Sequence, residues 1–360
     1  MNQPDKAKSI SLDDLGWREP FKSGFLARGI PGEIPARVVE EQRESYIVRS
    51  EAGELVAGIS GRLRHKALRR TDFPTVGDWV AVTARMEEGA ATIEAIVPRK
   101  SKLSRKTTGQ ESDEQLIAAN LDTVFIVTSL NKDFNVRRLE RYLALVSESG
   151  ALPVVLLNKA DLCSDLAAIL RELGTVIAGG VAVQAVSAVT GLGLAGLEPF
   201  LKKGETVALI GSSGVGKSTL INRLVGWERQ KVRSVRQADD RGRHTTTFRR
   251  LIPLPQGGLL IDTPGMREIQ LWETDGLTDT FADVVELIAA CRFGNCKHQT
   301  DAGCAVQAAM QDGRLPRERY AHYLKLGKES ENLANQREAK AGFIANRKIK
   351  RARAAYKREP

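Results

Sequence analysis

The chain has 360 residues, of which 42% are hydrophobic and 5% aromatic, so it is long enough for two or three compact domains and is not of a disordered or fibrous class. Its formal net charge is +10. Residues 60–106 hold 11 Lys and Arg against 5 Asp and Glu, and residues 291–360 hold 16 against 7, which predicts two nucleic-acid-contacting modules, although a charge run is also typical of a solvated surface. The apolar runs are far shorter than the roughly 18 residues of a membrane span, and the polar start does not resemble a secretory signal. We therefore expect a cytoplasmic protein without a membrane partner.

The N-terminal part of the chain predicts a small barrel behind a flexible segment. Residues 1–29 are polar with interspersed glycines and are expected to be loosely ordered. Residues 30–106 contain about five short apolar or alternating stretches separated by turn-rich residues, which predicts an OB-type β-barrel. The stretch 61–77 between two of these strands is expected to be a basic loop that binds RNA, with an inert docking module as the alternative. Its basic residues are Arg62, Arg64, Lys66, Arg69 and Arg70.

Residues 113–278 alternate apolar strands with helical stretches, which predicts a doubly wound α/β domain on a parallel sheet. The strand LPVVLL is followed by NKAD at 158–161. A carboxylate at position 161 accepts from both N1–H and the exocyclic amine of guanine, a donor pair that adenine lacks. NKAD alone is also consistent with an ordinary strand-to-helix turn, but a supporting Ser-Ala pair after a later strand favours guanine. The predicted base-reading residues are Asn158, Lys159, Asp161, Ser187 and Ala188.

The stretch GSSGVGKST at 211–219 lies between the strand VALI and the helical TLINRLV, which is the context of a phosphate-binding loop. Its glycines allow backbone N–H groups to surround phosphates, and the helix N-terminus adds its dipole. Lys217 is expected to bridge the β- and γ-phosphates as a catalytic residue, and Ser218 to ligate Mg²⁺. The predicted phosphate contacts are Gly211, Ser212, Ser213, Gly214, Val215, Gly216, Lys217, Ser218 and Thr219.

A DTPG motif closes the apolar strand LLID, 44 positions after Ser218. Asp262 fits the acid that supports Mg²⁺, and the N–H of Gly265 is placed to sense a γ-phosphate. The segment between these motifs, VRSVRQADDRGRHTTTFRRL, has no clear apolar period and predicts a mobile first switch.

Within that segment, Thr246 is the predicted Thr that closes on Mg²⁺, with Thr245 and Thr247 as alternatives in register. His244 is the candidate for orienting the attacking water, with a surface histidine as the alternative. The position after DTPG, where many GTPases have Gln, holds Met266, which cannot position water. Hydrolysis by the chain alone is therefore expected to be slow.

Three of the four cysteines lie within 14 residues, with a histidine among them. The pattern C-x4-C-x-H-x5-C supplies three thiolates and one imidazole, the ligand set of a closed structural zinc site. We expect one structural Zn²⁺ in a helical C-terminal domain, residues 279–360, with buried free cysteines as the alternative. The predicted ligands are Cys291, Cys296, His298 and Cys304.

The order of these motifs is unusual, because the guanine-reading residues precede the phosphate loop. In most guanine-specific P-loop proteins the order is the reverse. A circularly permuted P-loop GTPase domain accounts for the guanine-reading residues and for the phosphate loop that follows them. Permutation is tolerated where the original termini are close together at the surface. The sequence therefore predicts three parts: an OB-type barrel, a permuted α/β GTPase domain and a helical zinc-binding domain.

Together these motifs resemble the bacterial ribosome small-subunit-dependent GTPase A family, through PTVGDWVAV, NKADL, GSSGVGKSTLIN, GRHTTT, DTPG and CRFGNCKHQTDAGCAV. The resemblance covers nearly the whole chain. It implies a late-acting assembly factor that binds the immature 30S subunit and its 16S rRNA in the GTP state, and is released when the 30S subunit stimulates hydrolysis to GDP. It also implies zinc on the four ligands above and a catalytic role for His244. We expect a monomer. A GTP-gated RNA-binding scaffold with negligible catalysis is the alternative function, and an ATPase or kinase is a further one that Asp161 disfavours.

Overall fold

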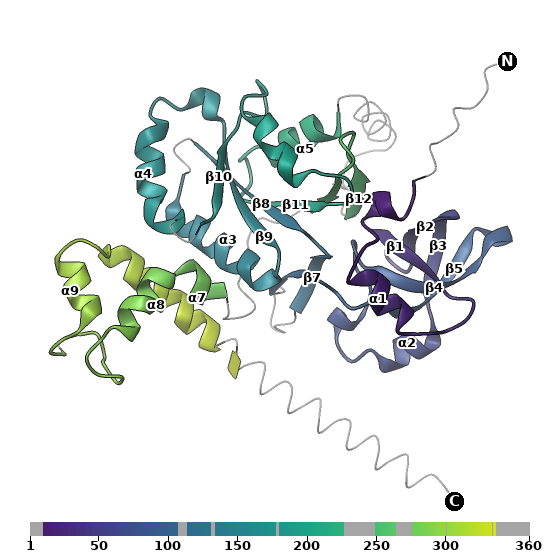
Figure 1. Cartoon of the computed structure of the whole chain (residues 1–360), viewed down its shortest axis with the longest axis horizontal. Helices are drawn as coiled ribbons and strands as arrows, with labels where there is room; N and C mark the ends of the chain where they lie inside the picture. The colour runs from purple at the N-terminus through teal and green to yellow at the C-terminus, as the bar shows by residue number, and fades with distance from the viewer. Residues whose placement is uncertain are drawn as a thin grey trace, which may run out of the picture.

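The structure is a computed structural model that describes residues 10–106, 114–130, 134–177, 180–226, 249–263, 276–299, 301–332 and 334–335. The described elements form three neighbouring bodies: an N-terminal barrel, a central sheet with helices on its faces, and a C-terminal group of helices (Figure 1). This agrees with the predicted multidomain architecture. None of the helices described in these ranges combines the length and apolar character needed to cross a bilayer.

The N-terminal body is a closed five-stranded barrel, as the sequence predicts. Its strands pair in the order β1-β2-β3-β5-β4, and β4 returns to β1. The β3–β5 pair is parallel and the other pairs are antiparallel. Alternate residues point inward and fill the centre with small and branched side chains such as Val38, Val48 and Ile93, which are fully buried. The strands are β1 (Ile34–Glu41), β2 (Tyr46–Ser50), β3 (Gly53–Ile59), β4 (Trp79–Arg85) and β5 (Ala90–Ile96).

The basic stretch between β3 and β4 is partly helical, and not the simple loop that the sequence predicts. The helix α2 (Gly61–Lys66) begins at Ser60, whose hydroxyl accepts from Leu63 N at 3.1 Å. A 3₁₀ turn, η2 (Arg70–Asp72), follows it, and another, η3 (Met86–Glu88), joins β4 to β5. The three residues of the last turn of α2, Arg64, His65 and Lys66, are exposed.

The N-terminal segment predicted to be flexible is structured over residues 10–29. It contains η1 (Asp13–Leu15) and α1 (Phe21–Leu26), whose residues Leu15 and Phe21 are 0% and 4% exposed. The ring of Trp17 lies 4.5 Å from that of Trp79 on β4. The polar composition of this segment concealed three aromatic residues spaced four apart, Trp17, Phe21 and Phe25. Their rings pack together and against Trp79, and so cover the barrel.

A two-stranded hairpin connects the barrel to the central body. Strand β6 (Lys102–Lys106) pairs with β7 (Glu114–Ala119) in a separate sheet. The end of the range predicted for the barrel, 30–106, therefore belongs to this hairpin and not to the barrel wall.

The central body contains a parallel sheet in the order β10-β9-β8-β11-β13, extended by the antiparallel strand β12. Strand β8 is buried along its whole length, as expected for a central parallel strand covered on both faces. The strands are β8 (Thr123–Ser129), β9 (Leu152–Asn158), β10 (Ala182–Ala185), β11 (Thr206–Ile210), β12 (Arg250–Pro253) and β13 (Leu259–Asp262). The helices and 3₁₀ turns are α3 (Val136–Ser149), η4 (Ala160–Leu162), α4 (Leu166–Ile177), η5 (Leu194–Phe200) and α5 (Lys217–Val225).

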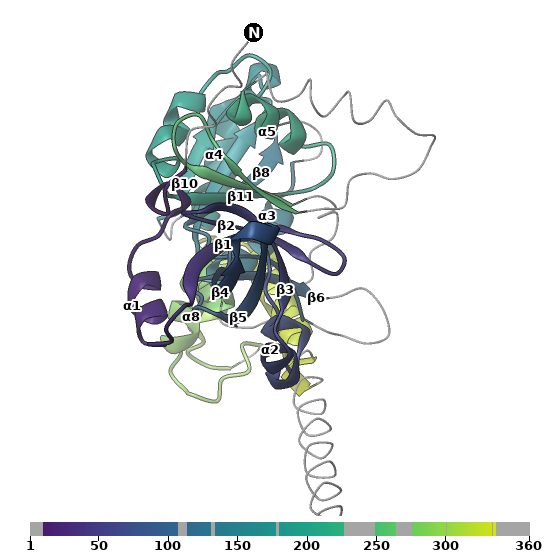
Figure 2. The ribbon, with the colours of Figure 1, turned by 90° about the vertical axis from the view of Figure 1, so that its right-hand side faces the viewer.

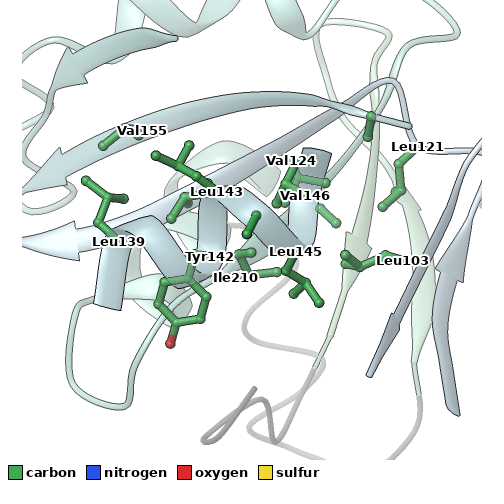
Figure 3. Close-up of a cluster of buried hydrophobic side chains, with 14 of the residues drawn as sticks. Leu103, Leu121, Val124, Leu139, Tyr142, Leu143, Leu145, Val146, Val155 and Ile210 are labelled. Carbon is green, nitrogen blue, oxygen red and sulfur yellow. The ribbon is translucent and has the colours of Figure 1, made fainter. Parts of the chain in front are cut away.

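Helix α3 forms the centre of the main core. Its N-cap Asn135 accepts from Arg138 N at 3.0 Å, and it ends at Gly150, whose φ of 79° is readily adopted by glycine. Leucines and valines at the spacing of one helix face point toward the sheet strands β8, β9 and β11 (Figure 3). Figure 3 labels Leu139, Leu143 and Val146 on the helix side of this cluster and Val124, Val155 and Ile210 on the sheet side.

The barrel and the central sheet are joined edge to edge, as the side view shows (Figure 2). Strand β1 pairs with β12 through Glu40 and Arg250. Beside this pairing, the fully buried guanidinium of Arg37 donates to the carbonyls of Leu15, Gly77 and Asn120 and to the hydroxyl of Thr206. One side chain thus connects the N-terminal segment, the barrel and the sheet.

The C-terminal body packs against α3. It contains α7 (Gly276–Thr280), α8 (Ala282–Ala289), α9 (Ala305–Gln311) and a helical stretch over 317–332. Arg319 donates to Glu140 of α3 at 2.5 Å and to Asp283 of α8 at 2.7 Å, and His322 also contacts Glu140. Because the side chains of Arg319 and Glu140 are 5% and 3% exposed, this network lies inside the interface.

Candidate nucleotide-binding and metal sites

The predicted phosphate loop lies at the carboxyl end of β11, where it enters α5. Gly211 has a φ of 144°, and a Cβ there would lie 2.2 Å from the carbonyl oxygen of Val127 on β8. Gly216 has a φ of 97°, and a Cβ there would lie 2.3 Å from Nδ2 of Asn158. Only glycine fits both positions, because the backbone conformation and the space each exclude a side chain.

Lys217, the first residue of α5, folds back over this loop. Its ammonium group donates to the carbonyl oxygens of Gly211 and Ser212, each at 2.6 Å. Burial lowers the pKa of Lys217 from its ordinary value. A bound phosphate would stabilise the charged form at this position, so the loop is suited to an anion. Of the other loop residues, Val215 is buried, whereas Ser213, Gly214, Ser218 and Thr219 are exposed.

Asn158 joins the two halves of the site that the chain order separates. Its Nδ2 donates to the carbonyl of Val215 in the phosphate loop at 2.8 Å, across 57 residues of sequence. Its Oδ1 accepts from the N–H of Ala188 at 3.1 Å. Lys159 also reaches the loop, donating to Gly214 O at 2.9 Å. The motif NKAD therefore contacts the phosphate loop directly.

The remaining residues predicted to read the base lie beside Asn158. Lys159 has a φ of 63°, a left-handed turn that leads from β9 into η4 and leaves Asp161 exposed. The N–H of Ala160 donates to Val186 O at 3.0 Å, which ties this turn to the end of β10. Ser187 is fully buried, and its hydroxyl accepts from Thr190 N at 3.1 Å. Its side chain thus stabilises the turn that carries Ala188.

Asp262 lies at the same edge of the sheet, at the end of β13 and next to β11. The pairing of Ala208 with Ile261 sets this register, and the hydroxyl of Thr263 donates to Leu209 O at 3.0 Å. The predicted residues Gly265, His244 and Thr246 lie outside the described ranges.

Tyr142 is a residue near the phosphate loop that the sequence analysis did not single out. It lies on α3, is 6% exposed, and its hydroxyl is 3.4 Å from Oγ of Ser212. In the sequence it is one more apolar position on the helix face, so periodicity alone gave no reason to select it.

The four predicted zinc ligands converge in the C-terminal body. Their donor atoms all lie within 4.8 Å of one another. Nδ1 of His298 lies 3.5 Å from Sγ of Cys291 and 3.6 Å from Sγ of Cys304, and those two sulfurs are 4.0 Å apart. Zn–S bonds of about 2.3 Å and Zn–N bonds of about 2.0 Å in a tetrahedron require ligand separations of about 3.5–3.8 Å. The donor set, completed by Cys296, therefore fits zinc.

Local backbone conformations hold these ligands in place. His298 has a φ of 57°, which is uncommon for a residue with a side chain, and its carbonyl accepts from Nε2 of Gln307 at 2.6 Å. Cys304 is the N-cap of α9, and its sulfur accepts from the N–H of Gln307 at 3.4 Å. This hydrogen bond fixes the position of the Cys304 sulfur among the other three donor atoms.

Comparison with known proteins identifies the family of the chain. A family model described as RsgA GTPase matches residues 96–272. The protein "Small ribosomal subunit biogenesis GTPase RsgA" of Opitutus terrae is 45% identical over 337 residues, covering 91% of this chain and 92% of the relative. The chain belongs to the RsgA GTPase family. A similar protein of Lactiplantibacillus plantarum, "Small ribosomal subunit biogenesis GTPase RsgA 2", is 46% identical over 334 residues, covering 91% of this chain and 94% of that protein.

Solved structures agree with this RsgA-family assignment. The crystal structure of YjeQ from Thermotoga maritima has a TM-score of 0.61 and 27% identity, covering 84% of this chain and 99% of that chain. The structure of YloQ, titled "a circularly permuted GTPase", has a TM-score of 0.60 at 24% identity and shows the same fold. The resemblance and the permuted fold class predicted from the motifs are confirmed.

Proposed function

We propose that this chain hydrolyses GTP to GDP and acts as a late-stage assembly factor of the 30S ribosomal subunit. The observation that carries the proposal is the position of Asn158, which hydrogen-bonds to the phosphate loop and to the turn at Ala188. A residue of the guanine-reading motif is thereby fixed against the phosphate-binding motif. The relatives named small ribosomal subunit biogenesis GTPases supply the cellular role.

In this proposal the GTP-bound chain holds 16S rRNA through its two basic parts, and hydrolysis releases it. The exposed basic residues of the stretch 61–70 support contact by the barrel, because phosphate contacts dominate the affinity of RNA-binding proteins. The buried Arg319 network fixes the C-terminal body to α3. The barrel and the C-terminal body are therefore both attached to the same nucleotide-binding domain. We propose a monomeric cytoplasmic protein.

The proposed chemistry is in-line attack of water on the γ-phosphate. Lys217 neutralises charge that develops on the phosphate oxygens, and His244 orients the water. Mg²⁺ with GTP supplies further charge neutralisation when bound, held by Ser218, Thr246 and Asp262. Because Met266 replaces the usual Gln, the basal rate is low and the 30S subunit stimulates it. The remaining proposed GTP contacts are those of the phosphate loop 211–219, Asn158, Lys159, Asp161, Ser187, Ala188 and Gly265.

A structural Zn²⁺ on Cys291, Cys296, His298 and Cys304 is part of the proposal. All four positions are taken by protein ligands, so no position remains for a reactive water. The ion would hold the segment between α8 and α9 and thereby the shape of the proposed RNA-binding surface.

GTP turnover by the purified chain, alone and with 30S subunits, 50S subunits or 70S ribosomes, tests the proposal. We expect a low basal rate that 30S subunits alone raise strongly, and loss of the stimulation in His244→Ala. Asp161→Asn should weaken GTP binding and favour the xanthine nucleotide, because the amide offers a donor where the carboxylate accepts. Equal turnover in all mixtures would contradict the ribosomal role.

A GTP-gated RNA-binding scaffold is the second candidate, and Met266 favours it because methionine cannot position water. It predicts GTP-dependent binding to 30S subunits without stimulated turnover. Strong stimulation that depends on His244 would exclude it.

A further inference from the structure

A cavity of about 300 Å³ lies between the barrel, the β6–β7 hairpin and the residue that precedes β12. This volume is at the lower end of the range of small-ligand sites. The cavity is separate from the nucleotide site, and it lies beside the basic stretch of the barrel. Its lining combines aromatic, charged and amide side chains, among them Glu41, Tyr46, Arg70, Phe73, Gln115 and Arg249.

The wall formed by residues 70–75 is fixed in place by a buried ion pair. Asp78, which is fully buried, accepts from Arg99 at 2.8 Å and from the N–H of Thr75 at 2.9 Å. Arg99 also donates to the carbonyl of Phe73 at 2.9 Å. Because the Arg99–Asp78 pair fixes this wall, the ring of Phe73 keeps its position without a ligand. Binding therefore costs little conformational entropy at this wall.

The opposite wall carries Arg249, whose guanidinium donates to the carbonyl of Leu116 at 2.6 Å and lies 3.7 Å from the carboxylate of Glu41. That carboxylate also accepts from the hydroxyl of Thr75 at 3.2 Å. Burial, together with the charges of neighbouring arginines, lowers the pKa of Arg249 although Glu41 acts in the opposite sense. The wall therefore holds a cation that one carboxylate only partly balances.

Arg70 adds a second cation at the exposed side of the cavity. Among the described residues, its side chain has neither an ion pair nor a side-chain hydrogen bond, in contrast to Arg99 and Arg249. The cavity thus has more positive than negative charge, with its aromatic rings on Tyr46 and Phe73. Protein sites that bind single-stranded RNA combine these features, because bases stack on rings and guanidinium planes while arginines bind phosphates.

We propose that this cavity takes one nucleotide of a single-stranded RNA segment, with its base against Phe73 and Tyr46 and its phosphate at Arg70 and Arg249. Glu41 and Gln115 offer an acceptor and a donor for the edge of the base. The proposal rests on the RNA-binding function proposed above and adds a site that holds a single unpaired base. Because Arg249 lies directly before β12, an occupied cavity would also restrain the start of that strand.

Two labelled RNAs test the proposal with the full chain: a mixed-sequence single-stranded decamer, and a decamer of the same length and charge that lacks its bases. Fluorescence anisotropy gives the dissociation constant of each. We expect Phe73→Leu to weaken binding of the intact RNA about tenfold and to leave binding of the abasic RNA within about twofold. The leucine keeps an apolar side chain, and melting temperatures establish that the variant is folded.

Arg70→Ala should weaken binding of both RNAs about tenfold, because it removes a phosphate contact. Arg43→Ala is the matched control: it removes one exposed charge from the barrel outside the stretch 61–77, and it does not line the cavity. We expect its effect to be below about threefold. Equal losses for Arg70→Ala and Arg43→Ala would indicate diffuse charge attraction and overturn the proposal.

The proposal would also be overturned if Phe73→Leu weakened binding of both RNAs equally, or if it had no effect on either. It would be overturned as well if nucleoside 5′-monophosphates displaced the RNA at equal nucleotide concentration, because the ligand would then be a free nucleotide. Absence of RNA binding by the unchanged chain would do the same. Co-sedimentation of the unchanged chain with 30S subunits then decides separately whether the proposed ribosomal function stands.

Discussion

Replacing Arg319 by leucine should release the C-terminal helices from the nucleotide domain. The guanidinium contacts Glu140 at 2.5 Å and Asp283 at 2.7 Å, and its side chain is 5% exposed. In Arg319→Leu the carboxylate of Glu140, only 3% exposed, loses its main cation. Removing one partner of a buried pair costs about 3–5 kcal/mol, because the remaining charge stays out of water.

Hydrogen exchange followed by mass spectrometry measures this loss locally. At about 1.4 kcal/mol for each factor of ten, peptides from the helical stretch 317–332 should exchange about 10² to 10⁴ times faster, up to the limit set by complete opening. Peptides from the barrel should be unchanged. Arg317→Leu is the matched control, because Arg317 is exposed on the same helical stretch and should leave exchange within about threefold.

The double variant Glu140→Leu with Arg319→Leu separates charge from packing. It removes the carboxylate that the single change leaves buried, so we expect protection to recover relative to Arg319→Leu. An Arg319→Leu effect below tenfold would refute the reasoning. So would a double variant that loses the sum of the two single effects.

Three further changes probe other parts of the molecule. Arg37→Met removes the donors to three backbone carbonyls and should lower the free energy of unfolding by about 2–4 kcal/mol; an unchanged urea midpoint by tryptophan fluorescence would contradict this. Gly216→Ala places a Cβ 2.3 Å from Asn158 Nδ2 at a φ of 97° and should weaken binding of a fluorescent GDP analogue roughly a hundredfold, about 3 kcal/mol, with the circular dichroism unchanged. Freshly purified protein should contain about one Zn per chain by metal analysis, retained in Cys163→Ser and lost in Cys296→Ser. Finding no zinc in the unchanged chain would contradict the assignment.

The sequence predicted those parts of the fold whose signals are local. The barrel strands and the parallel strands follow from short apolar or alternating runs between turns, and α3 follows from its apolar face. The phosphate loop was predictable because its glycines are required by the backbone itself, as Gly211 and Gly216 illustrate. The cluster of Cys291, Cys296, His298 and Cys304 was predictable from chemistry and spacing, since few functions other than metal binding need that set of side chains so close together.

The interfaces between the three bodies could not be predicted from the sequence. Arg37 and Arg319 are buried arginines, and nothing in the residues around them distinguishes them from the many exposed arginines of this basic chain. Their partners lie far away in sequence, as Arg319 and Glu140 do across 179 positions. The N-terminal segment was misjudged for a related reason: its average polarity concealed a few aromatic residues that pack on Trp79.

The strand order of the central sheet also bears on how the chain folds while it is being synthesised. Strands β8, β9 and β10 are consecutive in the chain and adjacent in the sheet, so the half of the sheet that carries the NKAD motif can pair before residues 211–219 have been synthesised. Pairing between β1 and β12, in contrast, must wait until nearly all of the central domain exists, because Glu40 meets Arg250. Contacts so distant in sequence form slowly, since the entropy of closing the intervening chain has to be overcome first. We therefore expect the strands of the half that carries the NKAD motif to pair early during synthesis, and β1 to pair with β12 late.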